Sequence, residues 1–397
     1  MATTLGTHAR APIGWVVDTV PKYQVGKVEG GEPYLFSRIA GTRQLSDGRV
    51  VVMDRASCEL RFFGPEGTFL GLAGGEGEGP GEFTAGITGR CDLVPSPGID
   101  TLRVFGRSGL SLFDDRGRFS HRSTVAWPGQ YATHVAGVSG ETVLVESQSA
   151  SKSREEGISR EPSAVDFALV ELESGRVLWE GSFAGANTYT VWVTGGPAGR
   201  AVWSIPFDIH PDAAMGMDGF FLTLGEEAGP EILEYDILGR LRRVIRLAEP
   251  VLAPSSEKLD EYIELQITRQ NIPDTSREAA FDGLRRRYAE MPLPTILPVF
   301  SRLLVDDAGW LWAELYRFAV ARPARWLVFG PNGKGLGSVD MPPDLEVWQI
   351  GRDFVLGVWE DELGVEYVRR HALIGRSRDD AGESRPTSQP RSRTGGS

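Results

Sequence analysis

Hydrophobic and polar positions alternate in short blocks along this chain. Between Leu45 and Phe83, apolar runs are separated by turns that contain Asp, Glu and Gly. The runs are Val50–Met53, Leu60–Phe63 and Phe69–Ala73. Short β-prone runs between turn signals are typical of antiparallel strands joined by hairpins. The pattern therefore predicts a chain built from short antiparallel sheets.

The same hairpin unit recurs through the chain. Each copy has an apolar run, a turn that ends in glycine and a second β-prone run; the copies are residues 61–72, 111–122, 169–180, 233–247 and 326–339. A sixth outer strand, Val365–Leu373, has no strand after it. The isolated strand within Gly14–Val20 has no hairpin partner nearby and would supply the missing one. Because radial stacking of four-stranded sheets protects their edges, this repeat predicts a closed ring.

The predicted fold is all-β: a six-bladed β-propeller closed by pairing of its N- and C-terminal strands, with a small helical insertion. We expect residues 1–13 to be a flexible lead-in, residues 14–374 to form the propeller and residues 375–397 to be a disordered tail. The helical insertion spans residues 255–292, where apolar residues recur at helical spacing. Ser256 is the predicted cap of its first helix. Thr275 and Glu278 form a candidate capping box for the second.

Composition narrows the function classes. The chain has 397 residues, 41% of them hydrophobic and 24% charged, which is typical of a soluble protein with a full core. Its 49 glycines fit many tight turns. The formal net charge of −12 argues against binding to nucleic acid or to an anionic membrane surface. No apolar run is long enough for a membrane span, and no export signal is visible at the N-terminus.

Motifs for catalysis or cofactor binding are missing from the sequence. It has no HExxH, CxxC or GxSxG pattern, so we expect no cofactor and no catalytic residue. The glycine-rich stretch Gly74–Phe83 lacks the lysine of a P-loop, and its three glutamates would repel phosphate. We interpret it as a connection between blades, with a weak Ca²⁺ site as the alternative. Cys58 and Cys91 are expected to be two buried thiols, and a bridge between neighbouring strand units is the alternative.

Residues 45–83, together with residues 325–373, resemble the NHL-like six-bladed β-propellers of bacteria. The shared features are an apolar run ending in Asp, a hairpin with a glycine turn, and the exit GGEGEGPGEF. The resemblance extends over most of residues 34–374. It implies a propeller without an assigned activity that works outside the cytoplasm, in the periplasm or after secretion.

The predicted ligand region is the mouth of the channel, where inner strands begin and the second and third strands of a blade are connected. Arginines mapped to these positions are Arg38, Arg55, Arg107, Arg302, Arg317 and Arg322. A guanidinium binds carboxylate or phosphate with two parallel hydrogen bonds, so this set favours an anionic ligand. Ordinary surface and inter-blade salt bridges are the alternative role.

The sequence thus predicts a non-catalytic binding or interaction scaffold. Its ligand, a protein or a small anion, would lie at the channel mouth or on the loop face. The rival prediction is a gluconolactonase-like hydrolase or lyase that holds a divalent metal in the channel.

Overall fold

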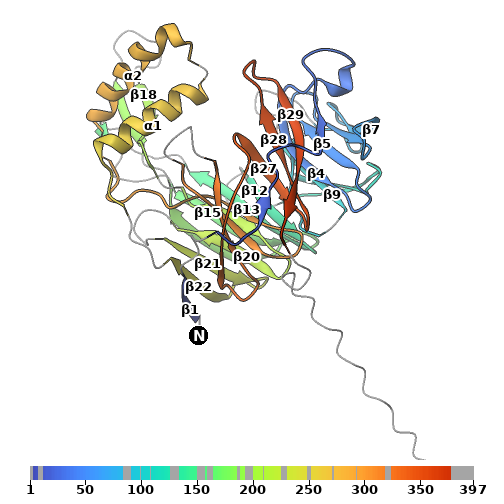
Figure 1. The fold of residues 1–397 in the computed structure, drawn as a ribbon. Helices are drawn as coiled ribbons and strands as arrows, with labels where there is room; N and C mark the ends of the chain where they lie inside the picture. The colour runs from blue at the N-terminus through green and yellow to red at the C-terminus, as the bar shows by residue number, and fades with distance from the viewer. Residues whose placement is uncertain are drawn as a thin grey trace, which may run out of the picture.

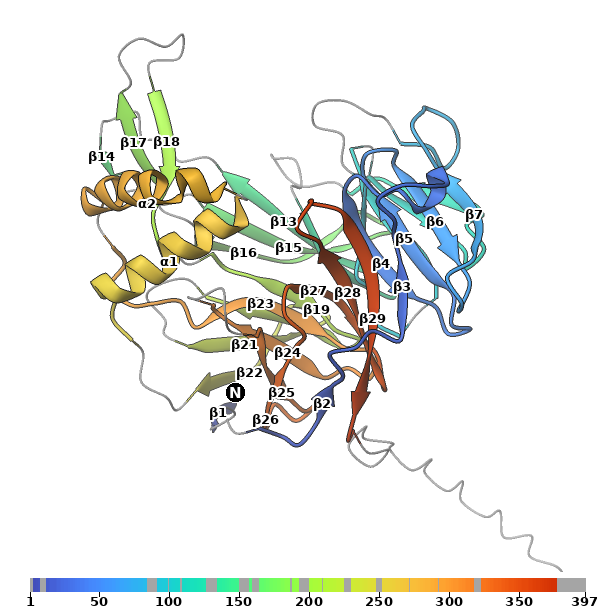
Figure 2. The same cartoon turned by 45° about the horizontal axis from the view of Figure 1, so that its top comes forward.

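The computed structural model describes residues 3–7, 12–83, 91–98, 100–107, 109–125, 134–149, 157–158, 164–185, 188–192, 200–208, 210–224, 230–247, 252–270, 272–291, 293–317 and 323–376. Six antiparallel sheets are arranged around one axis (Figures 1 and 2). The protein is a six-bladed β-propeller, which confirms the predicted fold class.

Each blade is numbered from its innermost strand outward. Blade 1 contains β4 Ile39–Gln44, β5 Val50–Asp54, β6 Glu59–Phe63 and β7 Phe69–Gly74. Blade 2 contains β8 Cys91–Leu93, β9 Leu102–Gly106, β10 Gly109–Phe113 and β11 Phe119–Ser123. Blade 3 contains β12 His134–Ser139, β13 Thr142–Ser149, β15 Ala164–Glu171 and β16 Val177–Ala184.

The second half of the ring repeats this order. Blade 4 contains β19 Ala213–Met215, β20 Gly219–Thr223, β21 Glu231–Asp236 and β22 Leu241–Leu247. Blade 5 contains β23 Phe300–Val305, β24 Leu311–Leu315, β25 Arg325–Phe329 and β26 Gly335–Asp340. Blade 6 contains β27 Leu345–Ile350, β28 Phe354–Glu360 and β29 Glu366–Ile374. The upper face is defined here as the face of the ring at which the innermost strands begin.

The hairpin turns explain why the repeat was visible in the sequence. In four of them, one Asp carboxylate oxygen accepts the backbone N–H groups two and four residues ahead; these residues are Asp114, Asp236, Asp306 and Asp361. Glycine stands three residues after each Asp with a positive φ, which a residue with a Cβ adopts at a cost. All five predicted outer hairpins are present, one in each of blades 1 to 5.

The hydrophobic core lies between blades. Each pair of adjacent blades encloses a cluster of buried apolar side chains from both sheets, as between blades 2 and 3, where Phe105 and Leu110 meet Val143. Because the sheets are covered on both faces, strands such as Val50–Asp54 are buried at every position. The strand therefore reads as an apolar run and shows no strict alternation.

The ring closes with a strand from the start of the chain, as predicted. β2 (Val16–Val17) pairs antiparallel with the end of β29, where Val16 lies opposite Ile374. The closing strand has a second part that the sequence did not indicate, because β3 (Tyr23–Val25) pairs with the beginning of β29. Blade 6 thus obtains its fourth strand in two pieces.

A disulfide joins blades 1 and 2. Cys58 lies in the turn between β5 and β6, and Cys91 begins β8. Their Cα atoms are 5.6 Å apart. The expectation of two separate thiols is therefore wrong. The sequence did not show that the turn of one blade meets the first strand of the next.

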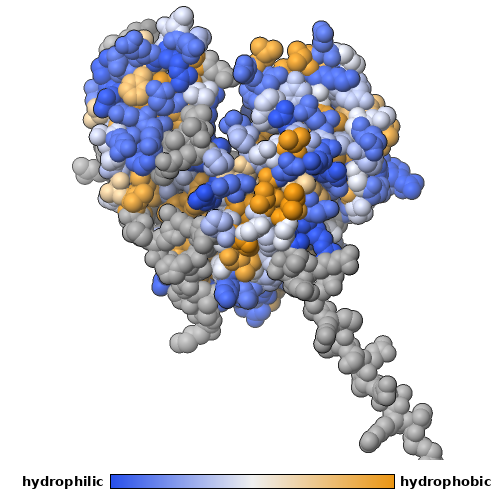
Figure 3. Space-filling model, viewed as in Figure 1, coloured by the Kyte–Doolittle hydropathy of each residue, from blue (hydrophilic) through white to orange (hydrophobic). Residues whose placement is uncertain are grey.

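An insertion stands on the upper face. The helices α1 (Ser256–Arg269) and α2 (Asp274–Ala289) lie beside a small sheet of β14 (Gly157–Ile158), β17 (Thr188–Trp192) and β18 (Arg200–Ser204) (Figure 2). Arg287 of α2 lies over the ring of Trp203, 4.2 Å from its centre. The space-filling view shows a notch between this insertion and the side of the ring that carries blades 6 and 1 (Figure 3).

Both predicted helix caps were wrong by one residue or more. Ser255, one residue earlier than predicted, caps α1 by accepting the backbone N–H of Lys258 at 3.2 Å. The N-cap of α2 is Pro273, and no side chain caps that helix. The helix starts early enough to place Thr275 inside its first turn, where it cannot act as a cap.

The two ends of the chain are held at different places. Within the expected lead-in, β1 (Thr3–Thr7) adds a parallel fifth strand to blade 4 beside β22. Residues 377–397, most of the expected tail, lie outside the described residues. Arg376, just before them, is buried against Asp306.

Candidate functional site

The six innermost strands surround a narrow central channel. Its cavity has a volume of about 60 Å³ and is lined from β4, β8, β19, β23, β27 and the connection that follows β8. Seven of the lining side chains carry polar groups: Thr42, Arg43, Ser96, Arg302, Asp307, Trp348 and Gln349. This volume has room for a carboxylate or phosphate group with little more.

Arg43 is a buried polar side chain of the channel wall that the fold leaves partly unsatisfied. It lies in β4, is 7% exposed, and its Nε atom is buried without a hydrogen-bond partner. Within the described part of the chain its guanidinium forms no ion pair. Burial lowers the pKa of Arg43, and the negative charges of Asp307 and Asp100 partly offset this effect. A buried guanidinium without a counter-ion is costly, which makes it a candidate anion site.

The charge of Asp307 acts on Arg43, but no ion pair within 4 Å joins the two residues, and other groups hold the Asp307 carboxylate. Its Oδ2 atom accepts a hydrogen bond of 2.8 Å from Gln349, and its Oδ1 atom accepts one of 3.3 Å from the backbone N–H of Gly98. Gln349 is fixed in turn by Gln44, whose backbone N–H donates to it at 2.7 Å. The lower end of the channel is thus tied together by a polar network that leaves Arg43 out.

At the upper end, Arg302 and Asp212 lie close to the start of β23. Arg302 is 28% exposed, lies 3.7 Å from a carboxylate oxygen of Glu346 and 5.4 Å from the ring centre of Trp348. Asp212 accepts the backbone N–H of Leu303. Burial raises the pKa of Asp212 to about 6, although that hydrogen bond and the charge of Arg302 both lower it.

The other predicted arginines are scattered. The backbone of Arg38 accepts a hydrogen bond from Arg55 at 2.7 Å, so these two lie together, but Arg55 directs its guanidinium to Asp92. Arg107 is exposed on the connection between β9 and β10. Arg317 lies 3.5 Å from Glu314, and Arg322 is outside the described residues. Among the predicted arginines that the structure describes, Arg302 alone lines the channel cavity.

Sequence reasoning missed Arg43, although a signal was present. Arg43 is a single charged residue near the end of a strand whose other residues are mostly buried, Ile39–Gln44. A charged side chain in an inner strand either faces the channel or is buried between blades at a cost in free energy. Position 43 was therefore a better candidate for a ligand-binding residue than arginines in turns.

The glycine-rich exit of blade 1 is held by its own hydrogen bonds. A carboxylate oxygen of Glu82 accepts the backbone N–H of Gly79 at 2.9 Å, and the N–H of Phe83 donates to the carbonyl of Gly75 at 2.8 Å. A Cβ on Gly77 would meet the Glu82 carboxylate at 2.0 Å, so a larger residue there would displace that side chain. These contacts fit a connection between blades better than a Ca²⁺ site.

The donor set for a channel metal is not assembled. No group of three or more His, Cys, Asp or Glu side chains that could hold a metal occurs among the described residues. Asp212 precedes an inner strand whereas Asp307 follows one, so the two carboxylates belong to opposite ends of the channel. The same ranges contain no helix that is both long and apolar enough to cross a bilayer.

The similarity of this chain to known proteins is low. No family model and no curated protein sequence matches the chain. Among solved structures, a member of the DUF4221 family from Bacteroides vulgatus is 12% identical, with a TM-score of 0.47, and the match covers 90% of this chain and 98% of that one. A gluconolactonase from Xanthomonas campestris is 11% identical, with a TM-score of 0.39, covering 85% of this chain and 87% of that one. Both TM-scores are below 0.5, so these similarities carry no argument about fold or function.

Proposed function

We propose that this protein is a non-catalytic binding scaffold that receives an anionic group of its ligand in the central channel, on Arg43. The observation that carries the proposal is the guanidinium of Arg43, which is buried in the channel wall and forms no ion pair with any residue that the structure describes. A carboxylate or phosphate would supply the missing hydrogen-bond acceptors.

Arg302 is the second residue of the proposed site. It lines the same cavity and is more exposed than Arg43, so it would meet the ligand on entry from the upper face. The notch beside the insertion offers space there for the remainder of the ligand, a protein segment or a small molecule (Figure 3). Arg38, Arg55, Arg107 and Arg317 remain predicted ligand residues of the surrounding loops.

The proposal places the protein outside the cytoplasm, as an NHL-like propeller. The disulfide between Cys58 and Cys91 supports this location, because structural disulfides persist mainly in oxidising compartments.

A titration with phosphate, acetate and citrate tests the site, with binding measured by calorimetry. We expect at least one of these anions to bind the wild type, and Arg43→Met to weaken that binding by about tenfold or more. Arg302→Glu should weaken it as well, and Arg38→Glu tests the loop prediction in parallel. Arg325→Met, an exposed residue of an outer strand, is the control.

Unchanged binding in Arg43→Met and Arg302→Glu would refute the channel site. Metal analysis of the purified protein addresses the enzyme alternative. Stoichiometric Ca²⁺ or Zn²⁺, lost on substitution of Asp212 or Asp307, would favour the hydrolase or lyase over the scaffold.

A further inference from the structure

A second cavity, separate from the channel, opens between blades 2 and 3. Its volume is about 700 Å³, which is within the range of small-molecule sites. One wall comes from β9, β10 and β11 of blade 2, and the other from the turns that follow β12 and β15 of blade 3. We call it the blade 2–3 groove.

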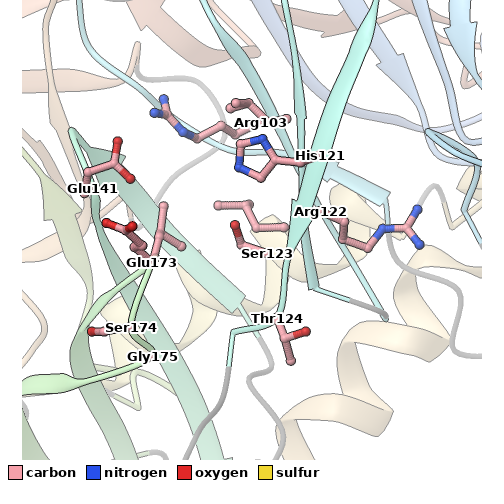
Figure 4. A pocket seen from close by; sticks show the side chains of 12 residues that line it. Arg103, His121, Arg122, Ser123, Thr124, Glu141, Glu173, Ser174 and Gly175 are labelled. Carbon is pink, nitrogen blue, oxygen red and sulfur yellow. The ribbon is translucent and has the colours of Figure 1, made fainter.

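Strand register places a basic row on the blade 2 wall. Arg103 of β9 lies opposite Leu112 of β10, which lies opposite His121 of β11. Residues that are directly opposite one another in neighbouring strands share a face of the sheet. Figure 4 shows the Arg103 and His121 side chains on the same side of the blade 2 sheet, with the Arg103 guanidinium extending toward the blade 3 wall, whereas Arg122 points the other way. On that other side of the sheet, the Nε–H of Arg122 donates a hydrogen bond of 3.0 Å to the hydroxyl of Ser111.

Arg103 is the feature that points to a ligand. It is 8% exposed, and both its Nε and Nη1 atoms are buried without hydrogen-bond partners. Its Nη2 atom donates to the carbonyl of Gly140 at 3.3 Å, which uses one of its five N–H groups. No carboxylate of the described chain forms an ion pair with it. Burial lowers the pKa of Arg103, and the negative charge of Glu141 partly offsets this lowering.

The blade 3 wall carries the opposite charge. Glu141 follows β12 and Glu173 follows β15, and both are exposed at the groove (Figure 4). Leu110, Leu112 and Leu172 supply apolar surface to the same cavity. The groove therefore offers a cation on one wall, carboxylates on the other and apolar side chains among them.

We propose that the blade 2–3 groove binds a small zwitterion with an apolar body, from a single aliphatic amino acid to a dipeptide. Its carboxylate accepts hydrogen bonds from Arg103 after a small movement of that side chain. Its ammonium group lies near Glu141 and Glu173, and its apolar side chain contacts the three leucines. A simple anion would meet two carboxylates here, which favours the zwitterion.

Calorimetric titration with leucine and leucyl-leucine tests this proposal, with 4-methylpentanoate and isoamylamine as analogues that lack the ammonium or the carboxylate. We expect leucine or leucyl-leucine to bind, and each analogue to bind about tenfold more weakly or not at all. Arg103→Gln should reduce binding about tenfold or more, and Glu141→Gln with Glu173→Gln should reduce it by less. Arg118→Gln, an exposed residue of the same blade, is the matched control.

Ser174→Trp provides a variant that does not disturb the buried arginine. Ser174 is exposed at the rim, so an indole there should block the groove without affecting the core. Absence of binding by both zwitterions, equal binding of isoamylamine, or binding unaffected by Arg103→Gln and Ser174→Trp would overturn the proposal. Because Arg43→Met leaves the groove intact, failure of the channel site and failure of this one are distinguishable.

Discussion

The closing seam of the ring and its central channel each contain a buried arginine, but the two arginines differ in whether a carboxylate is paired with them. In the seam, Arg376 is 1% exposed, lies 2.9 Å from a carboxylate oxygen of Asp306 and stacks over Trp15 and Trp310. In the channel, Arg43 is similarly buried and has no ion pair among the described residues. A buried charge with a partner holds the structure together, whereas one without a partner is a cost that function has to explain.

The seam joins three parts of the chain that are far apart in sequence. Trp15 comes from the N-terminal strand, Asp306 and Trp310 from blade 5, and Arg376 follows the last strand. The Asp306 carboxylate also accepts hydrogen bonds from the backbone N–H of Trp310 and the Nε1–H of Trp312, both at 2.9 Å. The seam therefore fixes the first and last strands to their neighbour, and this is where we expect the largest effects.

Arg376→Met should cause the largest loss of stability. It leaves the Asp306 carboxylate buried without its counter-ion, which typically costs about 3–5 kcal/mol of unfolding free energy. Urea unfolding followed by tryptophan fluorescence measures the change. The control is Arg325→Met, which breaks an exposed pair with Asp340 and should cost less than about 1 kcal/mol. Equal losses of stability in the two variants would show that the buried pair of Arg376 and Asp306 does not stabilise the seam more than an exposed pair does.

Reduction of the disulfide should have the next largest effect. The bridge spans 33 residues, and loss of a bridge of this kind typically costs about 2–4 kcal/mol. Urea unfolding of the wild type with and without dithiothreitol gives the difference. The double variant Cys58→Ser, Cys91→Ser should be insensitive to the reductant. Two free thiols in the untreated, denatured wild type would contradict the bridge.

Asp212 should make stability depend on pH at the upper end of the channel. Its pKa is about 6 in the folded protein against 3.8 as the ordinary value, so the folded state binds more protons between these values. Stability should fall as pH rises from about 4 to about 6, by up to about 3 kcal/mol, because deprotonation leaves a buried charge. Asp212→Asn should flatten this part of the profile in urea unfolding measured from pH 4 to pH 7. An unchanged slope would show that another group titrates there.

Arg43→Met should have the smallest effect and the opposite sign to Arg376→Met. Removing a buried cation that has no counter-ion should leave stability unchanged or raise it by about 1 kcal/mol. The same urea assay measures it. Destabilisation as large as that of Arg376→Met would mean that Arg43 has a structural partner. The proposed difference between the arginines of the channel and the seam would then be wrong.

The sequence indicated the blades because their turns are chemically local. A turn such as Asp361–Val365 is held by one carboxylate and one glycine within five residues, so its signal is complete in a short window. The strand Val50–Asp54 could also be predicted from the sequence, because burial on both faces requires an almost continuous apolar run. The closure through Val16 and Val17 was predicted by counting strands, because no strand follows β29 to complete blade 6.

The candidate site was predicted less well, because side-chain partners in this fold are distant in sequence. Arg302 lines the channel cavity, whereas Arg55 pairs with Asp92 of the next blade, which is the salt-bridge role that was the alternative for these arginines. Arg43 and Arg103 were overlooked. The buried strand around Arg43 indicated a charge that could face the channel, but no local window shows whether such a charge has a partner across the ring.

What the sequence determined by itself was the architecture: six hairpin units, a borrowed closing strand and a helical insertion. Only the tertiary structure decided which charges are neutralised. It brought Cys58 to Cys91, enclosed Arg376 with Asp306, and left Arg43 and Arg103 without an ion pair among the described residues. The physical reason is that turns and strands obey short-range rules of backbone geometry and burial, whereas the energy of a buried charge depends on atoms that only the closed ring brings within a few ångströms.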